Sequence, residues 1–406
     1  MPEKRFQLRD IFADWPRAFR LLAAAVFGVG VFFGVLLTLF NNFIVDRFGI
    51  EPHHLGYLEA LREVPGLLSV LMIALILRRP MPIVAGIAVV IMGLGIMAFS
   101  VASTVLVLAL FSFFWSIGFH CWVPLEQAMA LRYSPSGDKG RWLGRLRSIH
   151  SAAWLVAIGG CILGMRFVGY PGLFIGAGIV TAVGGAVLMF ASREPAADME
   201  KRLVFKRRYG LYYALNFLQG CRKQMFITFA IFALVKVHGM PVQTTMILVL
   251  INQILVTLTG PLMGRMVDRF GERAMLSASY IGLVFVFLGY AMVEHRPSLY
   301  VLYCIDNLIF FGGIALTTYL HKIAPQEELK PTLSMGVTMN HVAAVAAPLI
   351  GGLAWYHFGY KVIFFSGAVL AFVSLIVCQW VKPVSGDTTP NSGCTRATPI
   401  SQGSGT

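Results

Sequence analysis

Ionisable side chains stand inside stretches of this sequence that are otherwise apolar, and they are the residues best suited to chemistry. Arg222 and Lys223 lie together in NFLQGCRKQMF, and Glu59, Arg62 and Glu63 lie in YLEALREVPG. A guanidinium can bind a carboxylate or a phosphate through two parallel hydrogen bonds. A desolvated carboxyl group beside a second acid can hold and release a proton. The two segments therefore indicate an anion site and a proton-carrying group.

The elements that carry these residues are predicted to be membrane-spanning helices. The chain is 57% hydrophobic and only 13% charged, which excludes an ordinary soluble domain. A helix needs about 20 mostly apolar residues to cross the hydrocarbon layer of a membrane. Segments that meet this requirement are expected at residues 18–44, 54–77, 81–101, 104–128, 143–166, 170–191, 210–236, 243–264, 273–293, 298–321, 332–356 and 360–381. The fold class is therefore an all-α integral membrane protein with twelve transmembrane helices.

The net charge of +14 is explained by membrane topology, and no nucleic-acid partner is expected. With the N-terminus placed inside, five Lys and Arg residues fall in outer loops and three within spans. The inner loops and both tails then hold the other 25 of 33. This asymmetry follows the positive-inside rule. It predicts a multi-pass protein of the cell (inner) membrane, or plasma membrane, with both termini cytoplasmic.

Arg222 and Lys223 are expected near the middle of the membrane, where an ionised group costs at least about 2.5–3.5 kcal/mol. They lie about 12 residues into their span, or roughly 18 Å from its start. One interpretation is a substrate site for an anion, to which the polar neighbours Asn216 and Gln219 would contribute. The alternative is that each cation is neutralised by a buried acid such as Asp306. The sequence leaves both open.

The second span carries three charges on neighbouring faces of one helix. Glu59 and Glu63 share a face at i, i+4, and Arg62 can pair with Glu59 at i, i+3. The surplus carboxylate then becomes a candidate proton carrier. A purely structural network of ion pairs is the alternative.

Three further polar residues lie inside spans and are candidates for the same site. Asp306 and Asn307 stand about one third of the way into the tenth span, and His120 lies deep in the fourth. Asp306 or a histidine could couple proton binding to the binding of a substrate, because protonation of either can be tuned near neutral pH.

The chain divides into two halves at the polar segment SREPAADMEKRLVFKRRY. The expected organisation is a cytoplasmic segment at residues 1–17, which could form a surface helix, and a six-helix bundle at 18–191. A cytoplasmic linker at 192–209, a second six-helix bundle at 210–382 and a disordered cytoplasmic tail at 383–406 follow. None of the six cysteines lies in a CxxC pair, so no metal site, disulfide framework or cofactor is expected.

Matching features recur between the halves at an offset of about 190 residues, which indicates an internal duplication. HSAA at His150 matches HVAA at His341, and a double glycine follows each copy. The repeat predicts paired structural roles for these histidines, such as hydrogen bonds between helices. The string VDRFG also occurs twice, at Val45 and Val267, but these copies are 222 residues apart and are not equivalent parts.

Twelve spans in two halves, a basic linker and the loop GRMVDRFGER after the eighth span together resemble the major facilitator superfamily. The signature loop of that family matches at Gly264, Asp268, Arg269, Gly271 and Arg273. The resemblance implies a loop that acts as a cytoplasmic latch, and spans one, four, seven and ten around a central cavity. The sequence departs from the pattern at Glu272, where a basic residue is common, and in the first half, where only Arg78-Arg79-Pro80 remains.

These observations favour a transporter. No nucleotide-binding loop appears, so the energy is expected to come from an ion gradient, with H+ as the coupling ion. The leading hypothesis is a monomeric secondary transporter that works by alternating access on a small anionic or zwitterionic solute. Efflux of lipophilic or cationic drugs is one alternative. A membrane sensor or assembly partner that transports nothing is another, and an enzyme is not expected.

Overall fold

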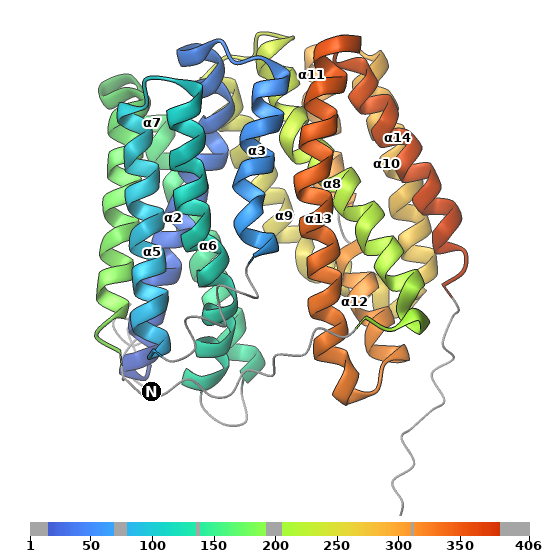
Figure 1. Ribbon diagram of the computed structural model, residues 1–406, viewed down its shortest axis with the longest axis horizontal. Helices are drawn as coiled ribbons and strands as arrows, with labels where there is room; N and C mark the ends of the chain where they lie inside the picture. The colour runs from blue at the N-terminus through green and yellow to red at the C-terminus, as the bar shows by residue number, and fades with distance from the viewer. Residues whose placement is uncertain (1–14, 69–78, 135–138, 192–204, 310–311, 382–406) are drawn as a thin grey trace, which may run out of the picture.

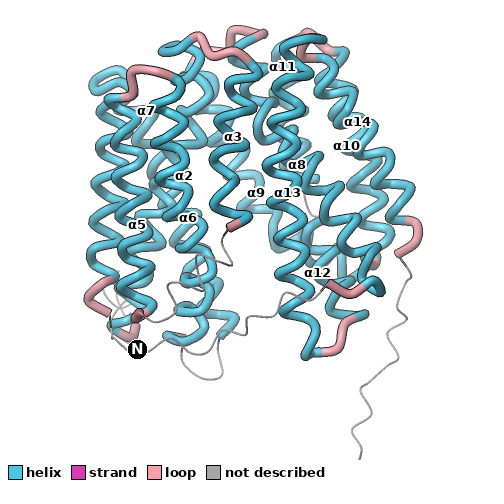
Figure 2. Tube along the Cα trace, in the orientation of Figure 1, coloured by secondary structure: helices cyan, strands magenta, loops and turns pink. Residues whose placement is uncertain are grey.

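The computed structural model describes residues 15–68, 79–134, 139–191, 205–309 and 312–381. Within these ranges the chain is built of helices joined by short loops, as Figure 2 shows. The predicted surface helix at 1–17, most of the linker and the tail lie outside the described ranges. Trp15 is described, and it packs edge-on against Phe19 and Trp142 with ring centroids 5.2 and 5.8 Å away.

The helices follow the two halves of the sequence. The N-terminal half contains α2 (Arg17–Phe48), α3 (Pro52–Leu67), α5 (Met81–Ala98), the short 3-10 helix η1 (Phe99–Val101), α6 (Val105–Tyr133) and α7 (Lys139–Leu188). The C-terminal half contains the 3-10 helix η2 (Arg207–Tyr209), α8 (Gly210–Lys236), α9 (Val242–Phe270), α10 (Glu272–Met292), α11 (Arg296–Ile309), α12 (Gly312–Ile323), α13 (Gln326–Phe358) and α14 (Lys361–Cys378). Figure 1 shows the two groups with α3 and α13 between them.

Each of the twelve predicted spans contains at least part of one of these helices, and the second span continues beyond α3 into residues 69–77, which lie outside the described ranges. The 50-residue α7 contains a non-helical residue, Gly169 with φ 59°, followed two positions later by Pro171. A left-handed residue reverses the chain, so α7 supplies the fifth and sixth spans. The tenth predicted span contains both α11 and α12. The all-α architecture of two six-helix groups is therefore confirmed.

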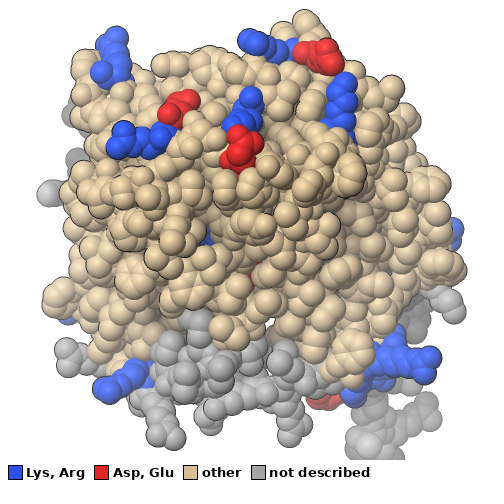
Figure 3. Space-filling view, turned by 45° about the horizontal axis from the view of Figure 1, so that its top comes forward, with Lys and Arg blue, Asp and Glu red and all other residues tan. Residues whose placement is uncertain are grey.

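The outer surface of the molecule suits a lipid environment. Eight of the described helices are long and apolar enough to cross a membrane. Large apolar side chains such as Leu106, Leu163 and Phe285 are exposed on them. The face in Figure 3 carries its charged side chains mainly near two opposite rims, with an almost charge-free zone between them. Such a zone can stay in contact with hydrocarbon without burying ionised groups.

Each of the two VDRFG strings ends a helix, although they occupy different places in the fold and their glycines differ in ψ. The first ends α2 and the second ends α9. Each terminal glycine has positive φ, 56° at Gly49 and 79° at Gly271. Glycine adopts this conformation without steric cost and so ends a helix. The repeated string is thus a repeated helix ending, which agrees with its not marking equivalent parts.

The two halves contact each other at the end of the molecule where α2 ends and α3 begins, which we call the far end. The opposite end, where α2 and α8 begin, is the linker end. At the far end the Asn42 side-chain amide donates a hydrogen bond to the Met240 carbonyl at 2.9 Å. Lys236 Nζ lies 3.1 Å from the Gly49 carbonyl and 3.0 Å from Glu51 Oε1. Each contact crosses from one half to the other.

The helices α3 and α13, one from each half, also approach each other closely at the far end. A Cβ atom added to Gly56 would lie 2.4 Å from the Pro348 carbonyl oxygen, and one added to Gly352 would lie 2.6 Å from that of Pro52. Such distances are too short for any side chain, so both glycines are needed for the two backbones to touch. This contact sets the first turns of α3 against the last third of α13.

Candidate functional site

The polar face of α3 is occupied by two carboxylates with different partners. Glu59 is buried and forms an ion pair with Arg62, as the i, i+3 spacing predicts. The Arg62 guanidinium lies over the Trp115 ring, 5.6 Å from its centroid. This pair is therefore neutralised within the N-terminal half, and Glu63 is the carboxylate that reaches toward the other half.

Glu63 forms a cluster with two histidines that come from different helices. Its Oε2 atom lies 3.4 Å from Nδ1 of His341 on α13 and 3.9 Å from Nε2 of His120 on α6. The two imidazole rings are 5.0 Å apart between centroids and steeply inclined to each other. The cluster of Glu63, His120 and His341 therefore spans the interface between the halves, on the linker side of the glycine contact.

The orientation of His120 is set by Ser116, one helical turn earlier. Nδ1 of His120 lies 2.9 Å from the Ser116 carbonyl oxygen, which can only accept a hydrogen bond. Nδ1 must therefore carry a hydrogen, and in the neutral imidazole Nε2 presents its lone pair toward Glu63. The Ser116 hydroxyl lies 3.0 Å from the same Nδ1 and donates to the Arg62 carbonyl, so it too can accept from Nδ1. Nε2 is buried and has no hydrogen-bond partner among the described residues.

The two cationic residues of α8 have separate surroundings. Arg222 is 1% exposed, and its Nη1 atom lies 3.2 Å from Oδ1 of Asp306 on α11, whose side chain is 6% exposed. This is the second of the two interpretations that the sequence leaves open, in which a buried acid neutralises the cation. Lys223 is half-buried and lies close enough to Glu63 for their opposite charges to attract. The adjacent cations therefore face different acids, one in each half.

The predicted polar neighbours are bonded mainly within their own helices. Asn216 donates to the Tyr212 carbonyl at 2.8 Å, and Asn307 donates to the Tyr303 carbonyl at 2.9 Å. Asn216 also accepts a long hydrogen bond of 3.5 Å from Asn340 of α13. Gln219 is buried on α8, one turn before Arg222. These residues stay candidates for contact with a substrate.

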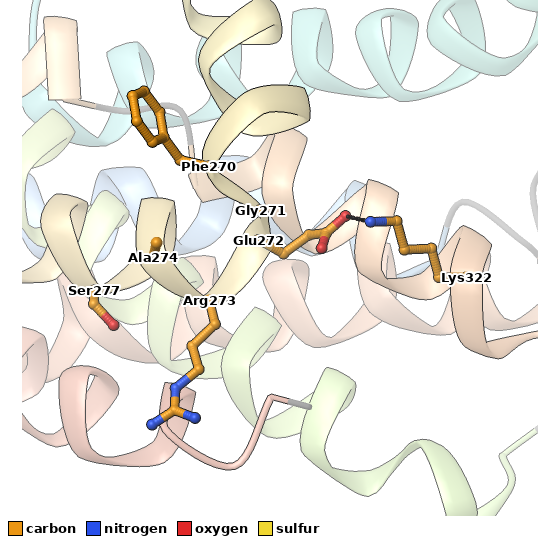
Figure 4. A pocket seen from close by; sticks show the side chains of 7 residues that line it. All are labelled: Phe270, Gly271, Glu272, Arg273, Ala274, Ser277 and Lys322. Atoms are coloured by element: carbon orange, nitrogen blue, oxygen red, sulfur yellow. Dashed lines mark ion pairs between the residues drawn. The ribbon is translucent and has the colours of Figure 1, made fainter. Parts of the chain in front are cut away.

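The signature loop lies at the linker end, between α9 and α10. Arg273 donates to Oε1 of Gln379 from two nitrogens, at 3.2 and 3.0 Å, and Arg269 lies over the Phe270 ring. The surroundings of Gly264 and the side chain of Asp268 lie outside the described part of the structure. The departure at Glu272 has a partner, because its carboxylate lies 2.7 Å from Lys322 of α12. Figure 4 shows this ion pair across a pocket that Gly271 and Ser277 also line.

Two contributors to the cluster are not among the site residues that the sequence indicates. The internal repeat predicts a structural role for His341, and no pattern in the sequence singles out Gly66. A Cβ atom on Gly66 would lie 2.4 Å from Nδ1 of His341 and 2.6 Å from Nε2 of His120. The available signal is a glycine three residues after an intramembrane Glu, which places both on one helix face.

Comparisons with known proteins identify the family. The sequence profile of the Major Facilitator Superfamily matches residues 22–312 and again residues 212–401. A search of curated proteins finds no significant match. Among solved structures, a mutant form of the nucleoside transporter NupG superposes with a TM-score of 0.77, at 13% identity over 90% of this chain and 99% of that chain. Unmutated NupG gives 0.74 at 12% identity over 90% and 98%.

A third structure has the same arrangement. A bacterial homologue of the human lysosomal transporter Spinster, in an inward-facing and unoccupied conformation, superposes with a TM-score of 0.71 at 14% identity. The match covers 90% of this chain and 96% of that chain. At these identities the superpositions establish the fold alone, whereas the profile match extends over both halves of the sequence. The chain therefore belongs to the Major Facilitator Superfamily, and it is a multi-pass membrane transporter of that family.

Proposed function

We propose that this protein is a secondary active transporter that moves a small anionic or zwitterionic solute together with a proton. The buried pair of Arg222 and Asp306 carries the proposal. Both groups are inside the membrane region, and the pair joins α8 to α11, which contain the seventh span and part of the tenth. In alternating-access transporters the solute and coupling-ion sites lie near the middle of the membrane, between the halves.

The pair suggests how proton binding and anion binding are coupled. While Asp306 is ionised it neutralises Arg222. Once Asp306 is protonated, the guanidinium loses its counter-ion in a place where an unpaired charge is costly. An anionic group of the solute then replaces the aspartate as its partner, by charge-assisted hydrogen bonds. The neutral assembly of Arg222, solute anion and protonated Asp306 is the species that moves with the alternating halves.

The surroundings of the pair suit this exchange. Tyr280 lies near Arg222, and Tyr290 and Tyr303 lie near Asp306. The hydroxyl groups of Tyr280 and Tyr290 are buried. Phenols stay neutral near pH 7 and can donate to an anion. Lys223, on the neighbouring face of α8, adds a second cation on the side of the interface. Glu59 and Arg62 neutralise each other and act structurally.

Far-end closure supports an assignment of the conformation. We place the linker end in the cytoplasm, as the distribution of Lys and Arg predicts. We also propose that the protein lies in the cell membrane and acts as a monomer. The contacts of Asn42, Lys236 and the glycines of α3 and α13 then close the outer side. The structure is accordingly assigned to the inward-facing part of the cycle.

Thermal unfolding of the purified protein in detergent, with and without small solutes, tests the solute class. One library contains organic anions and zwitterions, with nucleosides and nucleotides included because a similar fold belongs to a nucleoside transporter. The other contains lipophilic cations. A ligand stabilises the state it binds by mass action. We expect stabilisation by anions, its loss in Arg222→Ala, and its retention in the control Lys361→Ala at the exposed far end.

The opposite result would assign another function. Stabilisation by cations alone would favour efflux of lipophilic compounds. If anions do stabilise the protein, uptake of the stabilising anion into proteoliposomes, driven by a pH gradient, tests transport itself. A bound anion that is not transported would favour a sensor.

A further inference from the structure

We propose that Glu63, His120 and His341 form a binding site for a divalent transition-metal ion of the zinc class, placed between the two halves. Two imidazoles and one carboxylate are a common ligand set for zinc, with a fourth position left for water or another ligand. The inference concerns binding alone and does not depend on the proposed solute or on proton coupling.

The ligand atoms are already almost at the required separations. Zinc bonds nitrogen and oxygen at about 2.0–2.2 Å, so a tetrahedral ion holds its ligand atoms roughly 3.3 Å apart. Oε2 of Glu63 is 3.4 Å from Nδ1 of His341 and 3.9 Å from Nε2 of His120. The three ligand atoms all lie within 4.8 Å of one another. Side-chain rotations that move these atoms by about 1 Å complete the geometry.

The state of His120 is the one that a metal requires. Nδ1 is held by the Ser116 carbonyl and hydroxyl, so the lone pair of Nε2 points at another acceptor, the Glu63 carboxylate. Two acceptors that face each other repel unless a proton or a metal ion lies between them, and a metal ion can occupy this position. Metal-bound histidines characteristically donate their second ring nitrogen to a backbone carbonyl or carboxylate, which fixes the tautomer. Ser116 plays that part here.

Gly66 supplies the room. Its missing side chain leaves the space where the two imidazole nitrogens approach α3, since a methyl group there would lie within 2.6 Å of both. The site is thus bounded by three helices, α3, α6 and α13, of which the last belongs to the other half.

The nearby cations set the affinity. Arg62 is engaged by Glu59, and Lys223 attracts Glu63 from α8. A bound divalent ion would be repelled by Lys223, so Lys223→Ala should tighten metal binding. The same substitution removes a cation from the proposed anion site, so its effects on metal binding and on anion binding are opposite in sign. The two proposals can therefore fail separately.

The test uses full-length protein purified without a polyhistidine tag and stripped with a chelator. Co2+ is titrated first, because four-coordinate Co2+ gives intense visible absorption whereas hexahydrated Co2+ does not. We expect one equivalent to produce these bands, and one equivalent of Zn2+, but not of Mg2+, to abolish them. Absence of the bands with the wild-type protein would overturn the proposal, whatever the variants do.

Variants then assign the ligands. Glu63→Gln, His120→Asn and His341→Asn should each weaken Zn2+ binding by more than about tenfold. Loss of a residue that only supports a metal ligand already costs about that much, and loss of a ligand itself should cost more. His150→Asn is the matched control, because it occupies the equivalent repeat position and contacts Trp154 instead. Thermal unfolding without metal checks that each variant is folded. Unchanged Zn2+ affinity in the three folded variants would place the ion elsewhere and refute the site.

Discussion

Arg222 and Asp306 form an ion pair that is almost entirely removed from solvent, with Nη1 and Oδ1 3.2 Å apart. The pair joins α8 to α11 within the C-terminal half. A buried pair is strongly destabilised when one partner is lost, because the other charge is left without compensation. The proposed mechanism uses this property, since a proton and an anion together restore the neutrality that the pair provides alone.

The first prediction concerns the pH dependence of anion binding. Protonation of Asp306 releases Arg222, so the wild-type protein should bind its anion more tightly as the pH falls and lose it as the pH rises. Asp306→Asn imitates the protonated acid. Anion binding by this variant should therefore lose the pH dependence that Asp306 provides. The measurement is the ligand-induced shift in unfolding temperature at several pH values.

The control for that experiment is Glu294→Gln, which makes the same chemical change at an exposed far-end residue. It should keep the wild-type profile. Gradient-driven accumulation in proteoliposomes should be lost in Asp306→Asn while exchange of solute persists. If Asp306→Asn keeps the full wild-type pH dependence, the coupling residue lies elsewhere.

The second prediction concerns the stability of the pair. Arg222→Met should destabilise the protein by about 3–5 kcal/mol, because Asp306 would stay buried without its counter-ion. The double variant Arg222→Met with Asp306→Asn removes both charges and should recover most of this loss. Unfolding in detergent of the two single variants and the double variant measures the coupling. Additive losses would show that the two charges do not depend on each other.

Much of the architecture can be predicted because membrane spans are a one-dimensional signal. The first span is predicted at 18–44 and the helix is Arg17–Phe48, and the chain reversal within α7 falls between the fifth and sixth predicted spans. Charge-free length is enough for such predictions. The pairing of Glu59 with Arg62 is also predictable, because it depends only on helical periodicity.

The cluster cannot be predicted in the same way. Glu63 and His341 are 278 positions apart, and their contact depends on how closely α3 and α13 pack at Gly56 and Gly352. The internal repeat points to a structural role that His341 would share with its repeat partner, whereas the two histidines have different neighbours.

The partner of Arg222 is a similar case. The sequence indicates the right acid but cannot choose between a solute anion and Asp306, since that choice depends on the rotation of α8 about its axis. Only the packed structure, in which Arg222 is buried against α11, shows the pairing.

The third prediction tests the contact that closes the far end. Gly56→Val places a branched side chain against the Pro348 carbonyl, so α3 and α13 should separate and the far end should open. Gly159→Val is the matched control, because no described atom beyond its own helical turns lies within 4 Å of a Cβ at that position. A short thiol-specific cross-linker between cysteines introduced at His53 and Tyr356, whose rings are 4.4 Å apart, reports the closure.

Cross-linking should be efficient in a background without native cysteines and in the Gly159→Val control. It should fall severalfold in Gly56→Val. The cross-linked protein should be unable to transport, since the far end must open once in every cycle. Transport at the normal rate by the cross-linked protein would show that this contact is not a gate.

The last prediction concerns Glu272, where the sequence departs from the family pattern. Its carboxylate begins α10 and pairs with Lys322 of α12 at 2.7 Å, and the Glu272 side chain is 7% exposed while that of Lys322 is 43% exposed. Glu272→Lys would restore the basic residue that is common in the family, but it would face Lys322 and the positive end of a helix dipole. We expect a loss of about 1–2 kcal/mol, limited by the solvent around Lys322. The double variant Glu272→Lys with Lys322→Glu should recover the part due to the pair but not the part due to the helix terminus. If Glu272→Lys alone is as stable as the wild type, neither the ion pair with Lys322 nor the helix terminus favours glutamate at this position.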